Sequence, residues 1–381
     1  MKHLSTRLAG GALALVLAAV TLGALPTTAS ADAHVQVIAS GLNNPRHLSF
    51  TASGDLYVAE SGTGGDGPCF VGGEGNLVCY GPTGSITLVT LTKDGWAQRR
   101  VVTGLPSLAP PADIPPAVQK GGSASGPSAV LVTGSNFVAT VGLGADPAVR
   151  ATLALPTGFG GLVQGSVAGA KAGQWSVLAD IAGQEAATNP INDPDSNPAS
   201  LIKDGSKYVV ADAGGNTVVT ADNQGRMNTI AEFPDVLVPF ETPGGTIMIP
   251  MQFVPTSVVK GPDGAYYVSQ LTGFPFPPGG ASIWRFMPGE APTQYATGLT
   301  NVTDLAFAAD GSLYAVQIAA NGLLNGPIGS LVKIPAGGGA ATPVVQGLFA
   351  PYGMAIRDGA AYVTTGSVLA GGGQVIRVAL G

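Results

Sequence analysis

The segment VPTSVVKGPDGAYYVSQ, residues 254–270, carries the pattern that decides the fold. A short apolar run that begins near Pro255 leads to the turn Asp263-Gly264, and a second apolar run with the aromatic residue Tyr267 follows. Glycine suits such a turn because it adopts positive φ without steric cost. The segment is therefore predicted to form a β-hairpin.

The same pattern recurs six times along the chain. Each copy starts at a proline, or at Val302 in the fifth copy, and reaches an aromatic residue 12, 10, 10, 12, 12 and 11 positions later. The pairs are Pro45 and Tyr57, Pro127 and Phe137, Pro198 and Tyr208, Pro255 and Tyr267, Val302 and Tyr314, and Pro351 and Tyr362. Such constant spacing indicates one supersecondary unit that is repeated along the chain.

Further apolar runs extend most hairpins into four-stranded sheets. Third strands are expected at residues 85–91, 216–221, 282–286, 330–334 and 374–379, and fourth strands at residues 101–105, 295–299 and 344–348. Six such antiparallel units predict an all-β six-bladed β-propeller, because a closed ring protects edges that a solenoid leaves open. Two separate β domains are the alternative, but no linker divides the repeats.

The last unit lacks a fourth strand of its own. Residues 35–39 form an apolar run at the other end of the chain, and they are predicted to complete this unit beside residues 374–379. The composition agrees with a turn-rich ring. The chain contains 57 Gly and 30 Pro, and its 10% charged residues are too few for a coiled coil or a helical bundle.

Residues 1–31 are predicted to be a signal peptide. Lys2 and Arg7 precede the apolar run 8–25, and Ala29-Ser30-Ala31 offers the small residues of a cleavage site before Asp32. The alternative, a membrane anchor, is weakened by glycines within the run. We therefore expect a secreted, extracellular protein whose propeller spans residues 32–381 and which has no membrane anchor.

The charge of the mature chain limits its partners. Without Lys2 and Arg7, 15 basic residues face 23 acidic ones, a net charge of −8, and the basic residues form no cluster. Nucleic acid is therefore not an expected partner, and we expect a monomer. Cys69 and Cys79 are the only cysteines, so in an exported chain they are predicted to form a disulfide bond.

Three runs carry a resemblance to a known family. They are Asp195-Ser196-Asn197-Pro198, VADAGGN at residues 210–216, and LTGFPFPPG at residues 271–279. They resemble the ScyD/ScyE family of secreted bacterial propellers, over essentially the whole mature chain. The resemblance implies the propeller fold and export, and it assigns no catalytic residue.

The long connections are predicted to share one face of the propeller. Some lead into blades, and others join a second strand to a third; in an antiparallel blade both kinds lie on the same side. The connections are residues 61–84, 106–126, 181–197, 234–254, 271–281, 318–329 and 366–373. Long loops on a rigid scaffold are where binding sites are usually built, so we expect function on this face.

A calcium site is one candidate for this face. Glu60 and Asp212 occupy corresponding positions after Tyr-Val pairs, and with Asn197 and Asp304 they offer oxygen ligands from several blades at the mouth of the central channel. The alternative is that Asp212 and Asn216 cap the turn at residues 213–215.

The candidates for ligand binding are polar or aromatic. They are Arg46, His47, Asn216, Gln270, Gln317, Phe274 and Phe276. His47 either faces the channel as a functional group or has a structural role. The two phenylalanines belong to an apolar group with Phe233, Phe240, Met248, Met251 and Phe253, which either packs together as a lid or forms an exposed patch.

Two functions follow from these observations. The leading one is a secreted binding protein that holds a partner protein or a small apolar or polar ligand on the loop-rich face. The alternative is a metal-dependent propeller enzyme, either a lactonase-like hydrolase or a sugar oxidoreductase, with its site at the channel mouth.

Overall fold

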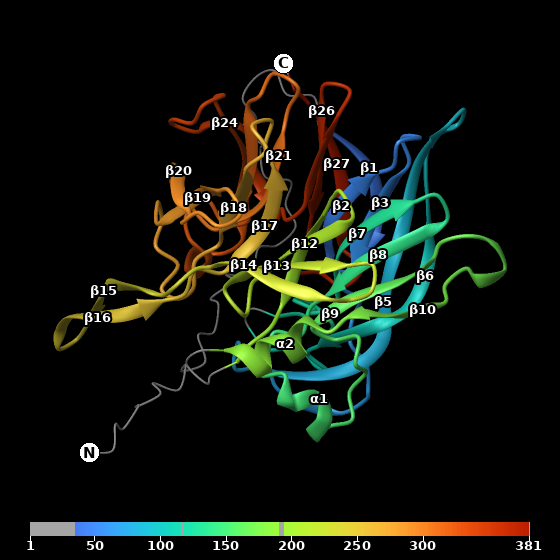
Figure 1. Ribbon diagram of the computed structural model, residues 1–381, viewed down its shortest axis with the longest axis horizontal. Coiled ribbons are helices and arrows are strands. Elements are labelled where there is room, and N and C mark those ends of the chain that lie inside the picture. The colour runs from blue at the N-terminus through green and yellow to red at the C-terminus, as the bar shows by residue number, and fades with distance from the viewer. Residues whose placement is uncertain (1–34, 116–117, 190–193, 381) are drawn as a thin grey trace.

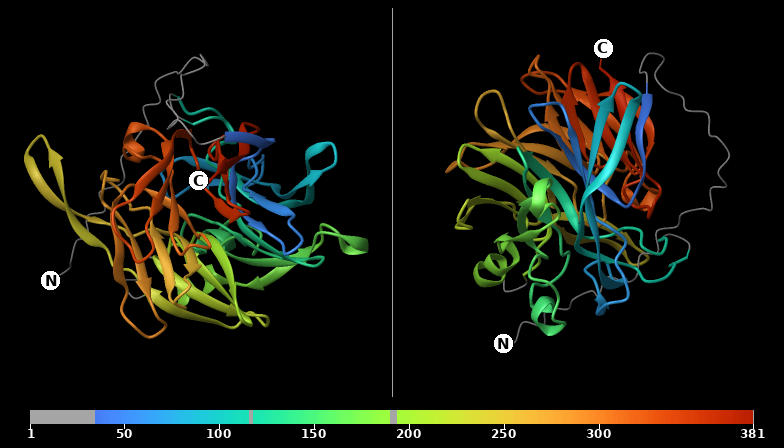
Figure 2. Two further views of the ribbon diagram at one scale, coloured as in Figure 1. Left: turned by 90° about the horizontal axis from the view of Figure 1, so that it is seen from above. Right: turned by 90° about the vertical axis from the view of Figure 1, so that its right-hand side faces the viewer.

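The computed structural model describes residues 35–115, 118–189 and 194–380, and Figure 1 shows their arrangement. The predicted signal peptide lies outside these residues. Sheets of antiparallel strands dominate the described chain, and six of them are arranged around a common centre (Figure 2). The prediction of an all-β six-bladed propeller is therefore confirmed.

The first three blades follow one another along the chain. Blade 1 contains β2 (Pro45–Phe50), β3 (Leu56–Glu60), β5 (Leu77–Thr92) and β6 (Gly95–Ala109), with the short β4 (Cys69–Val71) also paired to β5. Blade 2 contains β7 (Pro127–Thr133), β8 (Asn136–Val141), β9 (Gly161–Ser166) and β10 (Trp175–Ala179). Blade 3 contains β11 (Pro198–Asp204), β12 (Lys207–Asp212), β13 (Thr217–Asp222) and β14 (Met227–Glu232).

The other three blades complete the ring. Blade 4 contains β17 (Pro255–Lys260), β18 (Tyr266–Gln270), β19 (Ala281–Phe286) and β20 (Thr293–Leu299). Blade 5 contains β21 (Val302–Phe307), β22 (Leu313–Gln317), β23 (Ile328–Ile334) and β24 (Thr342–Phe349). Blade 6 contains β25 (Met354–Arg357), β26 (Ala360–Thr365), β27 (Gly373–Ala379) and β1 (Val35–Leu42).

Blade 6 joins the two ends of the described chain. β1 pairs antiparallel with β27, and the register places Val35 opposite Val378 and Val37 opposite Ile376. Ile38 is 6% exposed and packs in the apolar cluster between blades 6 and 1. The predicted closure by residues 35–39 is confirmed, and the pairing extends to Leu42.

Hydroxyl groups link each blade to the next around the channel. In five of the six links a serine or threonine donates to a backbone carbonyl of the following blade, and in the sixth Ser200 accepts from a backbone amide. The links are Ser61 to Pro127, Thr140 to Ala199, Val258 to Ser200, Thr256 to Val302, Thr303 to Tyr352 and Thr364 to Arg46. Each is worth about 1 kcal/mol net, and together they set the position of every inner strand relative to its neighbours.

The hydrophobic core is divided among the blades. Its clusters combine side chains of neighbouring sheets; Tyr57 of blade 1 and Phe137 of blade 2, for example, share one cluster. All six aromatic residues of the repeat are buried. The regular spacing in the sequence therefore reflects the need of each blade to present one large side chain to the cores between blades.

Several elements differ from the sequence prediction. Residues 234–254 contain the hairpin of β15 (Val236–Thr242) and β16 (Gly245–Met251), which projects from the ring in Figures 1 and 2. The sequence also gave no prediction for β9, β10 and β14, or for the helices α1 (Ala148–Thr152) and α2 (Ile181–Thr188).

The predicted disulfide bond joins Cys69 and Cys79, whose Cα atoms are 4.1 Å apart on the paired strands β4 and β5. It therefore fixes a local excursion of blade 1. Among the described residues, no helix has the length and apolar character needed to cross a lipid bilayer.

Ring closure can be tested at two neighbouring positions of β1. Ile38→Ala removes a buried side chain and is expected to lower the free energy of unfolding by about 3 kcal/mol. The matched control Val37→Ala changes a side chain that is 50% exposed and should cost less than about 1 kcal/mol. Urea unfolding followed by tryptophan fluorescence measures both. Equal losses would contradict the closure by β1.

Candidate functional site

The inner strands of the six blades line a central cavity of about 240 Å³. At one level of this channel, each blade contributes the residue two positions after its repeat proline, or after Val302. We call these six residues the channel ring: His47, Ala129, Ser200, Ser257, Asp304 and Gly353. The hydrogen bonds that link neighbouring blades hold these six residues at the same height along the channel.

His47 and Asp304 are in contact within the channel ring. His47 Nδ1 lies 2.9 Å from Asp304 Oδ2, and both side chains are buried. Asp304 also accepts hydrogen bonds from Ser257 Oγ at 2.7 Å and from Met354 N at 2.6 Å. These donors offset the cost of burying the carboxylate, and they fix both of its oxygens.

The lack of a side chain at Gly353 of blade 6 allows His47 of blade 1 to contact Asp304 of blade 5. A Cβ atom at this position would lie 2.4 Å from Arg46 O and 2.5 Å from His47 Cα. Because glycine contributes no side chain, the backbone of blade 6 packs directly on His47, and the amide of Met354 reaches Asp304. The small residue thus creates the space in which the two side chains make contact.

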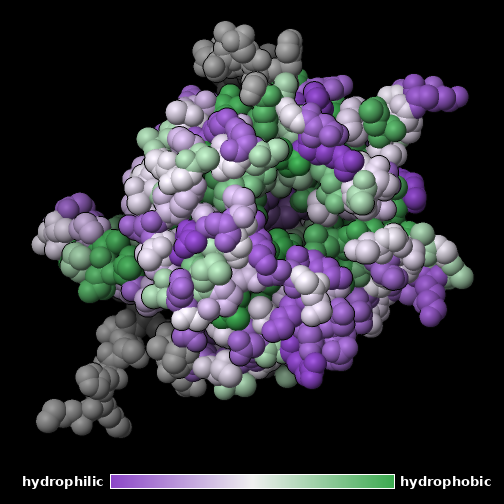
Figure 3. Space-filling view, turned by 45° about the horizontal axis from the view of Figure 1, so that its top comes forward, coloured by the Kyte–Doolittle hydropathy of each residue, from purple (hydrophilic) through white to green (hydrophobic). Residues whose placement is uncertain are grey.

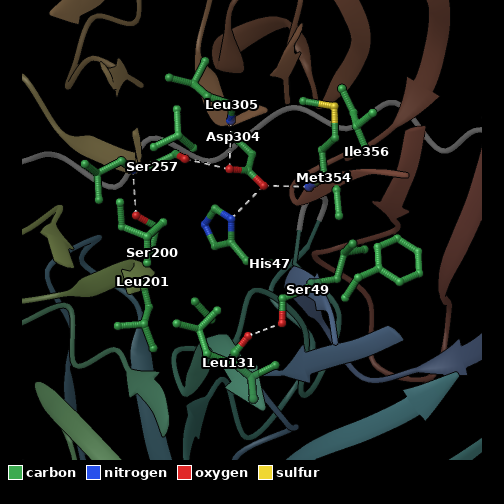
Figure 4. A pocket seen from close by; sticks show the side chains of 18 residues that line it. His47, Ser49, Leu131, Ser200, Leu201, Ser257, Asp304, Leu305, Met354 and Ile356 are labelled. Atoms are coloured by element: carbon green, nitrogen blue, oxygen red, sulfur yellow. Dashed lines mark hydrogen bonds and ion pairs between the residues drawn. The ribbon is translucent and has the colours of Figure 1, made fainter. Parts of the chain in front are cut away.

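The second ring nitrogen of His47 has no hydrogen-bond partner among the described residues. Since Asp304 accepts from Nδ1, the neutral imidazole carries its proton there and leaves a lone pair on Nε2. Figure 4 shows the imidazole projecting into the cavity between the other side chains of the channel. A buried acceptor without a partner costs about 1–3 kcal/mol, so its retention points to a functional role.

A stacked pair lies on the loop side of the channel ring. There Arg46 lies over the ring of Tyr352 at 4.6 Å, and the edge of the His47 ring meets Tyr352 at 5.2 Å. Arg46 is held by Ala124 O at 2.8 Å and Ser61 Oγ at 3.3 Å. Burial raises the pKa of the Tyr352 phenol, which therefore stays neutral. Neither side chain of the pair lines the cavity.

The predicted metal ligands belong to three separate networks. Glu60 binds Arg100 through both oxygens, at 3.0 and 2.7 Å, and accepts from Asn43 N at 2.7 Å. Asp212 accepts from Asn197 N at 2.6 Å and from Ser196 Oγ at 2.8 Å. Asp304 serves His47. The described residues contain no group of three His, Cys, Asp or Glu side chains arranged to hold a metal ion.

The expectation that Glu60, Asp212, Asn197 and Asp304 converge at the channel mouth therefore requires correction. Glu60 and Asp212 do occupy equivalent positions, each at the end of a second strand. There the carboxylate accepts a hydrogen bond from the loop that leads into its own blade. Gln317 occupies the same position and does the same, accepting from Thr300 N at 2.6 Å, whereas Gln270 accepts from Ser282 N of the third strand β19 at 3.1 Å. Repeat symmetry thus places these residues in different blades.

The remaining predicted residues lie near blade 4. Asn216 has a positive φ of 53° and accepts from Val254 N at 2.8 Å, so its side chain holds the loop before blade 4 and not the turn at residues 213–215. The Phe274 ring lies 5.0 Å from Phe240 and 6.3 Å from Phe276. The side chains of Asn216, Phe274 and Phe276 do not line the channel cavity.

One part of the apolar group packs together, and another part is exposed. Phe233 and Phe253 stack with centroids 4.0 Å apart and are buried, as is Met251. On the hairpin, Met248 is 56% exposed and Leu237 is 67% exposed. The hairpin projects at the left of Figure 3, where its inner part is apolar and its tip is polar.

Sequence reasoning placed His47 and Asp304 in different groups and missed their contact. It also missed Ser200, Ser257 and Gly353. The signal was present in the repeat itself, because all of them lie two positions after the proline, or Val302, that starts each repeat. Equivalent positions in a closed ring meet at one height. Aligning the repeats therefore predicts which residues meet, whereas a search for chemically reactive residue types does not.

No family model and no curated protein matches the chain. Solved structures share its fold. A calcium structure of a Trichoderma reesei carbohydrate-active enzyme of family AA12 has a TM-score of 0.54 and 9% identity, over 94% of this chain and 100% of that chain. A putative oxidoreductase (glucose dehydrogenase) of Thermus thermophilus has values of 0.51 and 14%, over 91% and 100%.

A gluconolactonase of Xanthomonas campestris is also similar, with a TM-score of 0.51 and 10% identity, over 92% of this chain and 90% of that chain. At these identities the similarity shows the shared propeller fold alone. The ScyD/ScyE assignment stays a prediction.

The buried carboxyl group of Asp212 should make stability depend on pH. Burial, with smaller effects of Asp195 and Glu185, raises its pKa to about 7 despite hydrogen bonds from Asn197 and Ser196. The unfolded value is about 3.9, so between these values the folded state holds the extra proton and loses stability as pH rises. Asp212→Asn removes this dependence.

From about pH 5 to about pH 7, wild type should therefore lose about 2 kcal/mol more than Asp212→Asn in the free energy of unfolding. Urea titrations at the two pH values measure the difference. Parallel pH dependence of the two proteins would show that Asp212 ionises normally.

Proposed function

We propose that the protein is a propeller hydrolase that opens a small neutral lactone, or cleaves a small acetyl ester, in its central channel. The observation that carries the proposal is the unpartnered Nε2 atom of His47, buried at the channel ring while Asp304 holds Nδ1. An imidazole held in this way can accept a proton from water close to neutral pH.

The reaction needs one water molecule and one proton carrier. His47 Nε2 removes a proton from water as the water oxygen attacks the carbonyl carbon of the substrate. The tetrahedral intermediate then collapses, the bond to the leaving oxygen breaks, and that oxygen takes the proton from the imidazolium. The products are a carboxylic acid and an alcohol, which in a lactone belong to one molecule.

Asp304 is the positioning residue for this step. Its contact with Nδ1 selects the tautomer that leaves Nε2 unprotonated, and its negative charge stabilises the imidazolium that forms. Because Ser257 and the Met354 amide fix both carboxylate oxygens, the imidazole has one preferred orientation.

Ser200 is the candidate for stabilising the developing negative charge. Its Oγ accepts from Val258 N at 2.9 Å, and the described residues offer its own proton no acceptor. The hydroxyl stands on the channel ring with His47, and both side chains point into the cavity in Figure 4. It can therefore donate to the carbonyl oxygen of a bound substrate.

The proposal agrees with the hydrolase alternative from the sequence, but it places the base on His47. Proteins with this fold include a structure described as a gluconolactonase, so the scaffold is compatible with lactone chemistry. Binding of a metal ion requires a separate test.

The direct test is hydrolysis of γ-valerolactone and of short alkyl acetates, followed by acid release. His47→Gln is expected to lower kcat/KM by about 100-fold or more, the usual contribution of a general base. Asp304→Asn should lower it by at least about tenfold, because an amide group favours the wrong tautomer.

Met248→Ser on the exposed hairpin is the control and should retain wild-type rates. Purified wild type that hydrolyses neither class of compound, or His47→Gln that keeps full activity, would refute the proposal.

A calcium ion bound by the four predicted residues is a second question. Glu60 is engaged by Arg100, and Asp212 by the loop at Asn197. We therefore expect the melting temperature to be the same in calcium and in chelator, for wild type and for Glu60→Gln. A rise with calcium that Glu60→Gln abolishes would establish the metal site instead.

The exposed hairpin supports a second candidate function, the partner-binding role that the sequence favoured. Leu237 and Met248 expose large apolar side chains, which suits contact with another protein. Mutations distinguish the two functions. Binding of a partner at the hairpin should be lost in the double variant Leu237→Ser and Met248→Ser and retained in His47→Gln.

A further inference from the structure

The wall of the channel is apolar beyond the channel ring. Going from His47 towards Phe50, each inner strand adds aliphatic side chains to the cavity. Leu131, Ile202, Val259 and Ile356 are among them, and the one polar side chain at these levels, Ser49, donates to Val130 O. The polar atoms are thus concentrated at one end, and a hydrocarbon surface covers most of the remaining length.

Exposure shows which end of the channel is open. At the channel ring, His47 and Asp304 are each 5% exposed, and the next level, with Val258 and Leu305, is equally buried. Leu131, Ile202, Val259 and Ile356, which lie farther along, are partly exposed. The channel therefore opens at the side where β2 turns into β3, opposite the long loops, and Figure 3 shows a hollow near the middle of the surface seen obliquely from that side.

The stacked side chains of Arg46 and Tyr352 lie beyond the other end, next to the channel ring. From His47 to Phe50 the inner strand advances by three residues, about 10 Å at the usual rise of a strand. The cavity is thus a narrow pocket with a polar floor and apolar walls. Ala129 is the small member of the channel ring that lines the cavity, and it leaves room at the floor for a compact polar group.

We propose that this pocket binds small neutral amphiphiles head first, with the polar group at His47 and a linear alkyl chain that extends towards Phe50 and Ile356. The inference deepens the proposed function and rests on it for the chemistry of the head group. It identifies the substrates as lactones or acetyl esters that carry an unbranched alkyl chain.

The charge of the head group follows from the floor of the pocket. Asp304 lies there, and Arg46 is separated from the cavity by its stacking on Tyr352. A carboxylate would be placed next to Asp304 in an apolar environment without a free cation, which is unfavourable. A carbonyl or hydroxyl group can instead bind His47 and Ser200.

The hydrophobic effect predicts the response to chain length. Each methylene group moved from water to the channel wall should increase affinity about fourfold, which corresponds to about 0.8 kcal/mol. The increase should stop once the chain fills the pocket, because further carbons remain in water. A branched chain of equal carbon number should bind more weakly, because six strands confine the pocket.

The test is the binding of the linear alcohols from 1-propanol to 1-decanol to the complete folded protein. These compounds have the head group and the chain but cannot be hydrolysed. The ¹³C-labelled methyl group of Met354, which lines the cavity, reports binding by NMR. We expect affinity to rise with chain length to a plateau, and we expect intermolecular NOEs from the terminal methyl group of the alcohol to Ile356.

Two matched variants locate the site. Leu131→Trp narrows the open end of the pocket and should weaken the binding of 1-octanol by at least tenfold. Leu237→Trp makes the same replacement on the hairpin, where the side chain is 67% exposed, and should leave binding unchanged. Because the NOEs report the orientation in wild type, they test the proposal even if Leu131→Trp does not fold.

The outcomes distinguish this inference from the proposed function. Chain-dependent binding without hydrolysis of the alkyl lactones supports the pocket and refutes the hydrolase. Lactone hydrolysis that requires His47 but is insensitive to chain length supports the hydrolase and refutes the pocket. Affinity independent of chain length, NOEs that place the terminal methyl at His47, or loss of binding only in Leu237→Trp would each overturn the inference.

Discussion

The whole structure depends on the closure of the ring by β1 and β27. This pairing makes blade 6 a complete sheet, and the hydroxyl links between consecutive blades then form an unbroken circle. A circle allows no gradual drift in height from one blade to the next, so equivalent residues of the repeats meet at one level. His47 and Asp304 are 257 positions apart in the chain, yet they are in contact because both follow the start of an inner strand by two residues.

The same geometry shows how far the sequence could lead. Turn motifs and aromatic spacing predicted the number of blades and the closing strand, because these depend on local patterns. Blade 2 was harder, since a long connection that contains α1 separates β8 from β9. The hairpin β15–β16 lies outside the repeat, so the sequence predicts only a long connection there. Its register is visible only once Val236 and Met251 are paired.

The candidate site was harder still, for a physical reason. The residues that ended second strands, such as Glu60 and Asp212, looked like metal ligands because they are acidic and equivalent. In a ring, equivalence keeps residues in separate blades unless their side chains reach the axis, and these bind the loops of their own blades. Gly353 was invisible to a search for chemical groups, although its missing side chain is what lets His47 meet Asp304. The proposed hydrolytic site therefore lies at the axis and not among the long loops.

The account depends most on the state of one imidazole. Nitrogen-15 NMR of the folded protein, with His47 assigned by comparison with His47→Gln, measures which ring nitrogen carries the proton. The account predicts the neutral tautomer with hydrogen on Nδ1 and an unprotonated Nε2 whose resonance shifts when 1-octanol is added. A proton on Nε2 in the neutral form, or a resonance that ignores the alcohol, would contradict it.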